Sequence, residues 1–300
     1  MTQEELRGFL ESEYGLKPQP ADPFVRSAGI HSQARIGRNV RFGRDVVVHE
    51  NVEIADDVEI GDRVTLRNCR LGGGVRVEEN CVIGYRTLTG GFTHKLDGYR
   101  EVTPTLLGEN TLVRTGAVVY QSVVVGEHCW INHMVLLREQ TRIGHHTSIG
   151  TMTDSEGYNS IGSHVAVHSQ VQLCARLLIE DYVFVAPMTV FANGNPMGYA
   201  RPHLNSSEQG GIVRFGAMIA AGVIVMPRVE IGYEAIVGPG SVVNRDVPNL
   251  TVVMGYPIRN AGLVPPEQRM PAEIRRGYYG GSEEPPPPSA IAAVHTETKS

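Results

Sequence analysis

The 300-residue chain has no uninterrupted apolar run close to the roughly 20 residues that a membrane-spanning helix needs. Its first ten residues also lack the apolar core of a secretory signal, which predicts a cytoplasmic protein. Lysine is rare, and a formal net charge of -5 does not indicate a partner such as nucleic acid or an anionic membrane. The four cysteines show no CxxC spacing, so the sequence does not indicate a zinc ribbon or a dithiol motif.

Large aliphatic side chains recur at every sixth position through most of the chain. A period of six matches neither a helix nor a single strand, and it is the signature of a hexapeptide-repeat β-helix. Cys81 and Cys129 occupy slots that prefer a small residue, which predicts packing thiols. The pattern slips by one residue before Leu71 and lacks its aliphatic at Ser155, where we expect a bulge or a bent corner. The clearest stretch of the repeat contains Val125, Ile131, Leu137, Ile143 and Ile149.

Three hexads form one coil of about 18 residues, and stacked coils pair strand on strand about 4.8 Å apart. No coil can bury its own core, so stacking supplies the stability. The chain length predicts an all-β rod of about ten coils. Trp130 precedes an inward aliphatic and should therefore point outward, into a subunit interface or against a ligand.

The segments outside the repeat define the organisation. Residues 1–24 should form a short helix and a linker, and residues 25–257 the β-helix with excursions at 86–106 and 192–212. Residues 258–282 should form a C-terminal cap and residues 283–300, with four consecutive prolines, a disordered tail. A count of 18 residues per coil places both excursions on one edge, about six coils apart and too distant to share a pocket.

The last repeats read MIAAGVIVMPRVEIGYEAIVGPGSVVNRDVPNLTVVMGYPIRN, and VFVAPMTVFANGNP lies upstream. Both stretches resemble CoA-dependent hexapeptide acyltransferases, most closely the nucleotide-sugar N-acetyltransferases, and the resemblance covers residues 108–259. It implies a left-handed parallel β-helix, a homotrimer, and acetyl-CoA or another acyl-CoA as co-substrate. It also implies an amine acceptor such as a nucleotide-linked amino sugar, and no metal.

The same resemblance suggests residues that bind the cofactor. Ala221 and Gly222 align with the family's IGANA motif, and Gly238 and Ser241 align with its VGAGS motif. Either Arg245 or Arg259 could form charge-assisted hydrogen bonds with a CoA phosphate. Pro239 and Tyr256 depart from the pattern, and the serine of the second pair is equally well explained as a turn residue. The residues in question are Ala221, Gly222, Gly238, Ser241, Arg245 and Arg259.

Three residues are candidates for the chemistry, because attack on a thioester needs a base for the incoming nucleophile and donors for the oxyanion. His133 follows an inward aliphatic by two residues, as the base does in UDP-N-acetylglucosamine acyltransferases, although the Asp-Cys that follows it there is replaced by Met-Val. His203 lies in the second excursion. Asn195 stands where other hexapeptide acetyltransferases carry a histidine, which resembles enzymes in which the substrate itself assists deprotonation.

Two other functions stay open at this stage. His128, His146 and His164 are 18 residues apart and should stack, which suggests a zinc site like that of γ-class carbonic anhydrases, although the spacing does not complete a ligand set. Asp154 and Glu156 could contact a substrate amine or simply be solvated. A rod without catalytic activity, serving only as a scaffold, is the remaining alternative.

Overall fold

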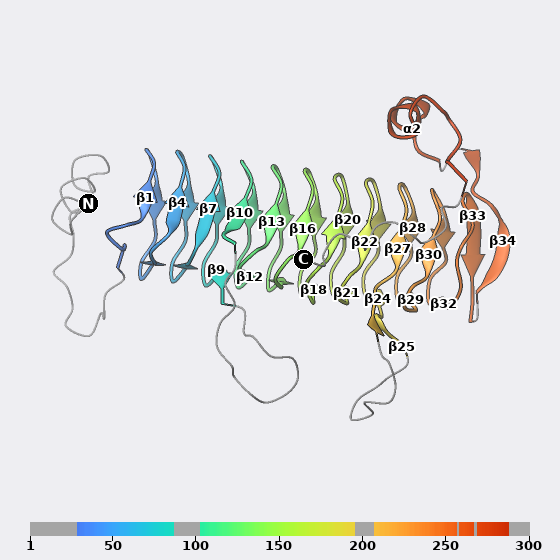
Figure 1. The fold of residues 1–300 in the computed structure, drawn as a ribbon, viewed down its shortest axis with the longest axis horizontal. Coiled ribbons are helices and arrows are strands. Elements are labelled where there is room, and N and C mark those ends of the chain that lie inside the picture. Colours follow the sequence, from blue (N-terminus) through green and yellow to red (C-terminus); the bar gives the residue numbers. More distant parts are fainter. Residues whose placement is uncertain (1–28, 87–102, 196–206, 257, 267–268, 288–300) are drawn as a thin grey trace.

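The computed structural model describes residues 29–86, 103–195, 207–256, 258–266 and 269–287. They form a parallel β-helix in which three stacked faces enclose one aliphatic core (Figure 1). Among these residues, no helix is long and apolar enough to cross a membrane. The predicted helix within residues 1–24 lies outside the described part.

Each coil contributes one short strand to each face. The first face contains β1 (Arg35–Ile36), β4 (Val52–Ile54), β7 (Cys69–Leu71), β10 (Thr105–Leu107), β13 (Val124–Val125), β16 (Arg142–Ile143), β19 (Ser160–Ile161), β22 (Leu178–Ile179), β27 (Ile212–Val213) and β30 (Glu230–Ile231).

The second face ends in an antiparallel hairpin formed by its last two strands. It contains β2 (Arg41–Phe42), β5 (Glu59–Ile60), β8 (Arg76–Val77), β11 (Leu112–Val113), β14 (Trp130–Ile131), β17 (Ser148–Ile149), β20 (Ala166–Val167), β23 (Phe184–Val185), β28 (Met218–Ile219), β31 (Ile236–Val237), β33 (Thr251–Met254) and β34 (Arg259–Leu263).

The third face contains the strands from which both excursions leave. It is formed by β3 (Val47–Val48), β6 (Thr65–Leu66), β9 (Val82–Tyr85), β12 (Val118–Tyr120), β15 (Leu136–Leu137), β18 (Asp154–Ser155), β21 (Gln172–Leu173), β24 (Val190–Phe191), β29 (Ile224–Val225) and β32 (Val242–Val243).

Three edges join the faces, and their geometry explains the repeat. The first edge follows the first face (126–129 in one coil), the second edge follows the second face (132–135), and the third edge follows the third face (138–141). A Cβ atom on Gly144, which follows an inward isoleucine, would lie 2.5 Å from Ser163 Oγ and 2.7 Å from the Gly162 carbonyl carbon. The neighbouring coil therefore approaches Gly144 too closely for a side chain, which favours glycine at this position.

The six-residue register gives the expected core. Ile131, Leu137 and Phe191 are fully buried, and Trp130 points outward with 58% of its surface exposed, as predicted. Cys81 and Cys129 are buried packing thiols, and burial raises the pKa of Cys81 to about 11.

The expected bulge at Ser155 is wrong. Strand β18 pairs in register with β15, Leu137 opposite Ser155, and the serine is fully buried. Its hydroxyl lies 3.1 Å from Thr141 Oγ1 and accepts a 2.9 Å hydrogen bond from Asn159 Nδ2. A polar cluster inside the core thus replaces the missing aliphatic side chain. A shift in strand register occurs elsewhere, where β12 pairs with β9.

The two excursions leave the same edge, but the expected distance between them needs correction. Strands β9 and β24 are five steps apart on the third face, about 24 Å at the usual strand spacing, and not six. The count of 18 residues per coil included the first excursion as if it were a coil of the rod. In the structure Val82 pairs directly with Val118, so the excursion adds no coil. The first excursion is shorter than expected, because Thr105 already belongs to β10. The second contains a short antiparallel pair of its own, β25 (Gly194–Asn195) with β26 (Ser207–Glu208).

The C-terminal segment folds back onto the first edge. Helix α2 (Ala272–Tyr278) lies beside the last coils (Figure 1), with the Tyr278 ring stacked 3.9 Å from that of Phe215. Residues 283–286, which composition assigned to the disordered tail, make contacts. Glu284 pairs with Arg269 at 3.3 Å. The remainder of the predicted tail, from residue 288, lies outside the described residues.

Candidate functional site

His133 occupies the second edge, where the chain turns from β14 to β15. The turn is closed by Met134, whose φ of 54° lies in the left-handed region. The His133 side chain is 39% exposed, so the imidazole is accessible from solvent. Histidine is the side chain best suited to take and return a proton near neutral pH.

A carboxylate two coils away faces this imidazole. Glu78 Oε2 lies 3.9 Å from His133 Nδ1, and it accepts hydrogen bonds from the Thr115 backbone N–H at 3.0 Å and the Thr115 hydroxyl at 3.1 Å. Arg114 Nε donates to the other carboxylate oxygen at 3.4 Å. Partial burial opposes ionisation of Glu78, but the bonds from Thr115 and the charge of Arg114 outweigh it and lower its pKa. Glu78 is therefore a fixed anion beside the histidine.

Sequence reasoning missed Glu78, although a signal was present. His133 stacks on Thr115, and Thr115 stacks on the turn that contains Glu78, because the first excursion separates β8 from β11 in sequence but not in space. Removing the excursion before counting coils would have placed the turn that contains Glu78 and Glu79 beside the histidine.

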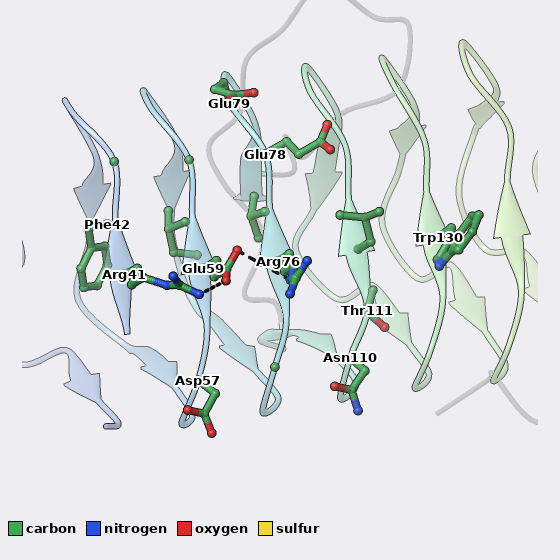
Figure 2. A pocket seen from close by; sticks show the side chains of 16 residues that line it. Arg41, Phe42, Asp57, Glu59, Arg76, Glu78, Glu79, Asn110, Thr111 and Trp130 are labelled. Carbon is green, nitrogen blue, oxygen red and sulfur yellow. Dashed lines mark hydrogen bonds and ion pairs between the residues drawn. The ribbon is translucent and has the colours of Figure 1, made fainter. Parts of the chain in front are cut away.

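A groove of ≈ 950 Å³ runs over the outer surface of the second face and ends at this cluster (Figure 2). Its floor is an ion-pair ladder in which Glu59 bonds Arg41 on one side and pairs with Arg76 Nε at 3.6 Å on the other. Trp130 closes the end toward the middle of the rod, and Glu78 lines the side at the second edge. The groove thus brings an exposed indole and several carboxylates next to a histidine.

Three of the residues expected at a cofactor site lie on the same edge as His133. Ala221 and Gly222 are exposed four coils further along, and Gly238 is one coil beyond. A Cβ on Gly222 would meet nothing within 4 Å, whereas the equivalent slots of earlier coils hold Met152 and Met188. Packing does not require a glycine there, and its absent side chain leaves the edge open.

Ser241 differs from these residues because its side chain is buried. Its hydroxyl donates to the Gly238 carbonyl at 2.6 Å and accepts from the Gly255 N–H at 3.0 Å. The hydroxyl is thus committed to holding the turn, and it can shape a neighbouring site only through the backbone.

The two arginines come together at the C-terminal end of the rod. Arg259 opens β34 and is exposed, opposite Met254 at the second edge. Arg245 lies on the third edge, and its Nη2 donates to the carbonyl of Ile258 at 2.7 Å. Arg245 therefore braces the segment that carries Arg259.

Asn195 lies on a different edge from His133. Asn195 belongs to β25, which follows the third face and so leaves from the third edge. His203 lies outside the described residues.

The predicted histidine ladder exists on the first edge. The rings of His128 and His146 stack at 4.9 Å, those of His146 and His164 at 5.1 Å, and Tyr182 continues the stack at 4.6 Å. The stacked rings follow one another along the rod and do not converge on one point. In the part of the chain that the structure describes, no group of three or more His, Cys, Asp or Glu side chains is arranged to hold a metal ion.

No family model matches the chain. Over 88 residues, 28% of the chain and 44% of the relative, it is 35% identical to a Saccharomyces cerevisiae protein provisionally named an acetyltransferase. Over 54 residues, 18% of the chain and 20% of the relative, it is 39% identical to a Schizosaccharomyces pombe protein provisionally named a serine acetyltransferase. The chain thus spans less than half the length of these curated relatives.

Solved structures of similar repeat architecture belong to acyl-transferring enzymes. A UDP-N-acetylglucosamine acyltransferase of Bacteroides fragilis is 19% identical, with a TM-score of 0.46, over 78% of this chain and 72% of that one. A hexapeptide-repeat acetyltransferase of Vibrio cholerae, complexed with acetyl-CoA, is 23% identical, with a TM-score of 0.32, over 53% of this chain and 70% of that one.

Proposed function

We propose that this chain transfers an acetyl or other small acyl group from acyl-CoA to the amine of a small polar acceptor. The observation that carries the proposal is the second edge itself. It holds an exposed histidine faced by a fixed carboxylate and, further along the same edge, the open backbone at Ala221 and Gly222. The acetyltransferase names of both curated matches support the reaction class. The fold by itself would not distinguish this function from others.

His133 would act as the general base, with the negative charge of Glu78 beside it. The acceptor nitrogen attacks the thioester carbonyl, and its N–H proton passes to the imidazole. The tetrahedral intermediate then collapses, the C–S bond breaks, and the proton leaves with the thiolate as CoA thiol. The anionic Glu78 stabilises the imidazolium formed between these steps, and backbone N–H groups of the edge would stabilise the oxyanion.

Between His133 and Ala221, the second edge carries exposed apolar side chains that suit an acyl-pantetheine arm. Met134, Met152 and Met188 project from it, with 54–64% of each side chain exposed. Four coil steps separate His133 from Ala221, about 19 Å at the usual strand spacing. Methionine adapts its shape to flexible apolar partners, so this strip suits an extended aliphatic chain. Arg259, with Arg245 bracing its segment, would meet the phosphates at the C-terminal end.

A mechanism without a protein base is the second version of this proposal. Asn195, from the second excursion, would then hold the acceptor amine. His203, from the same excursion, is the alternative to His133 as the base. Because Asn195 leaves from a different edge, this version requires the excursion of one subunit to meet the second edge of another. A homotrimer with sites between neighbouring rods would satisfy that requirement, and a nucleotide-linked amino sugar is the first acceptor to test.

Titration calorimetry with acetyl-CoA tests the proposal. We expect micromolar binding that weakens at least tenfold in Arg259→Ala, since charge-assisted bonds to phosphate are lost. Arg245→Ala should weaken binding less, because Arg245 acts through the Ile258 backbone. Arg142→Ala, an exposed arginine on the first face, is the matched control and should bind normally. If neither acetyl-CoA nor longer acyl-CoAs bind at millimolar concentration, the proposal is wrong.

A further inference from the structure

The groove on the second face is long, and charges of both signs alternate in its lining. It extends from β2 to β14, which is four strand steps or about 19 Å. Its volume of ≈ 950 Å³ is at the upper end of the range of about 300–1,000 Å³ for small-ligand sites. On the floor, Arg41 and Arg76 flank Glu59 and leave one net positive charge, whereas Asp57 and Glu79 place carboxylates at the sides. An ion of either sign would therefore meet attraction and repulsion together.

The polar side chains of the groove keep hydrogen-bonding capacity of both kinds. A guanidinium has five N–H donors, and the Arg41 and Arg76 side chains stay 70% and 66% exposed although both pair with Glu59. At the sides, Asp57 accepts a 3.1 Å hydrogen bond from an amide and Glu79 one of 3.2 Å from a hydroxyl, while a carboxylate can accept about four. Donors on the floor and acceptors at the sides together suit hydroxyl groups, which donate and accept.

Glycines keep the groove open along its length. Gly43 and Gly61 line it at the second edge, where no side chain extends over the floor. On the opposite side, a Cβ atom on Gly74 would lie 2.5 Å from Asn110 Oδ1, so the glycine makes room for this amide. Asn110 is exposed and lies on the same side of the groove as Asp57 (Figure 2). An uncharged donor and acceptor thus joins the lining.

An aromatic platform distinguishes this groove from the rest of the rod. The Trp130 indole is 58% exposed at the end of the groove, two coils beyond Arg76. The first face carries an equivalent ion-pair ladder, in which Glu53 pairs with an arginine on either side, one of them Arg70. Two coils beyond Arg70, however, the outward residue is Val124. The ladder is therefore common to both faces, and the indole is not.

We infer that the groove binds an unbranched, extended chain of neutral sugar rings, such as a β-1,4-linked glycan. The apolar face of one ring would stack on the Trp130 indole, and hydroxyl groups of the other rings would bond to the floor and the sides. One ring of such a chain advances by nearly the strand spacing of about 4.8 Å, so successive rings would meet successive coils. The inference goes beyond the proposed function and does not depend on it, since acyl transfer requires no glycan in this groove.

Trp130 is the single tryptophan of the chain, so its fluorescence reports directly on the groove. The probes are cellotetraose and tetra-N-acetylchitotetraose, compared with glucose and with maltotetraose, whose α-1,4 linkages curve the chain. We expect a saturable change with at least one extended tetrasaccharide, and added salt should not weaken it because the ligand carries no charge. Glucose and maltotetraose should bind at least tenfold more weakly, since neither can follow the floor from coil to coil.

Matched variants show whether the groove itself holds the glycan, with titration calorimetry as the readout because Trp130→Ala removes the fluorophore. Trp130→Ala and Arg76→Ala should each weaken tetrasaccharide binding at least tenfold. Met218→Ala, exposed on the same face outside the groove, should not change it. Arg70→Ala, from the equivalent ladder on the first face, should also leave binding unchanged.

Three results would each overturn the inference. They are the absence of a saturable response to both extended tetrasaccharides, equal binding of glucose or maltotetraose, and the same loss in Arg70→Ala as in Arg76→Ala. Unchanged thermal unfolding of the variants shows that they are folded.

Discussion

Nδ1 of His133 lies 3.9 Å from Oε2 of Glu78, and the same oxygen is held by two bonds from Thr115. The carboxylate is thus fixed by the coil between them and not by the histidine itself. At 3.9 Å the pair makes no hydrogen bond, so the glutamate acts on the imidazole mainly through its charge. The distance between such a base and the carboxylate beside it can shorten when substrate binds.

Replacing Glu78 should slow the reaction. In Glu78→Gln the imidazolium that forms during the reaction loses the charge that stabilises it, so kcat should fall roughly tenfold, with little change in KM for acyl-CoA. Glu109→Gln, on the first edge, is the control and should leave kcat unchanged. An unchanged kcat in Glu78→Gln would contradict the pairing of Glu78 with His133.

Replacing His133 distinguishes the two versions of the mechanism. If the imidazole is the base, His133→Ala should lower kcat by about 10²–10⁴-fold while acetyl-CoA still binds normally. His168→Ala is a matched control, because His168 is exposed on the same edge, two coils further from Glu78. Full activity in His133→Ala would favour the version in which the substrate assists its own deprotonation.

Most of the rod could be predicted because the six-residue period depends only on which side chains face inward. The pattern needs only an aliphatic residue at each buried position, such as Ile131 or Leu137, so it is visible in the sequence. The pairing of His133 with Glu78 could not be read in the same way, because an excursion of undetermined length separates their coils. The return of α2 onto the first edge depends on single contacts, such as that of Tyr278 with Phe215, which leave no periodic signal.

The polar cluster in the core gives a prediction that opposes the sequence pattern. Ser155→Val restores the aliphatic register, yet it removes the acceptor of the Asn159 amide and the partner of Thr141. We expect the variant to be less stable by about 1–3 kcal/mol, since a buried donor left without a partner costs more than the added methyl groups gain. Denaturant unfolding monitored by circular dichroism measures the change. Ser160→Val, on the exposed surface of the first face, is the control, and a stabilised Ser155→Val would refute the argument.

Alkaline pH should detach the C-terminal segment before the rod unfolds. Burial and the nearby charges of Glu180 and Asp181 raise the pKa of Tyr278, and burial and the hydrogen bond to Glu234 raise that of Tyr279. Both phenols stay protonated in the folded state above pH 10, where those of the detached segment ionise. The stability that they contribute is complete below about pH 10 and falls as pH rises further, because the detached state then binds fewer protons.

Hydrogen exchange of the α2 amides between pH 8 and 11 measures this loss, after correction for the intrinsic effect of pH. Protection of α2 should decrease above pH 10, while protection of core strands such as β14 persists. Tyr279→Phe removes one titrating group together with its 2.9 Å bond to Glu234. It should lower protection at neutral pH but make the remaining protection less sensitive to pH. If α2 in Tyr279→Phe keeps the full pH dependence, the Tyr279 phenol is not what senses alkali.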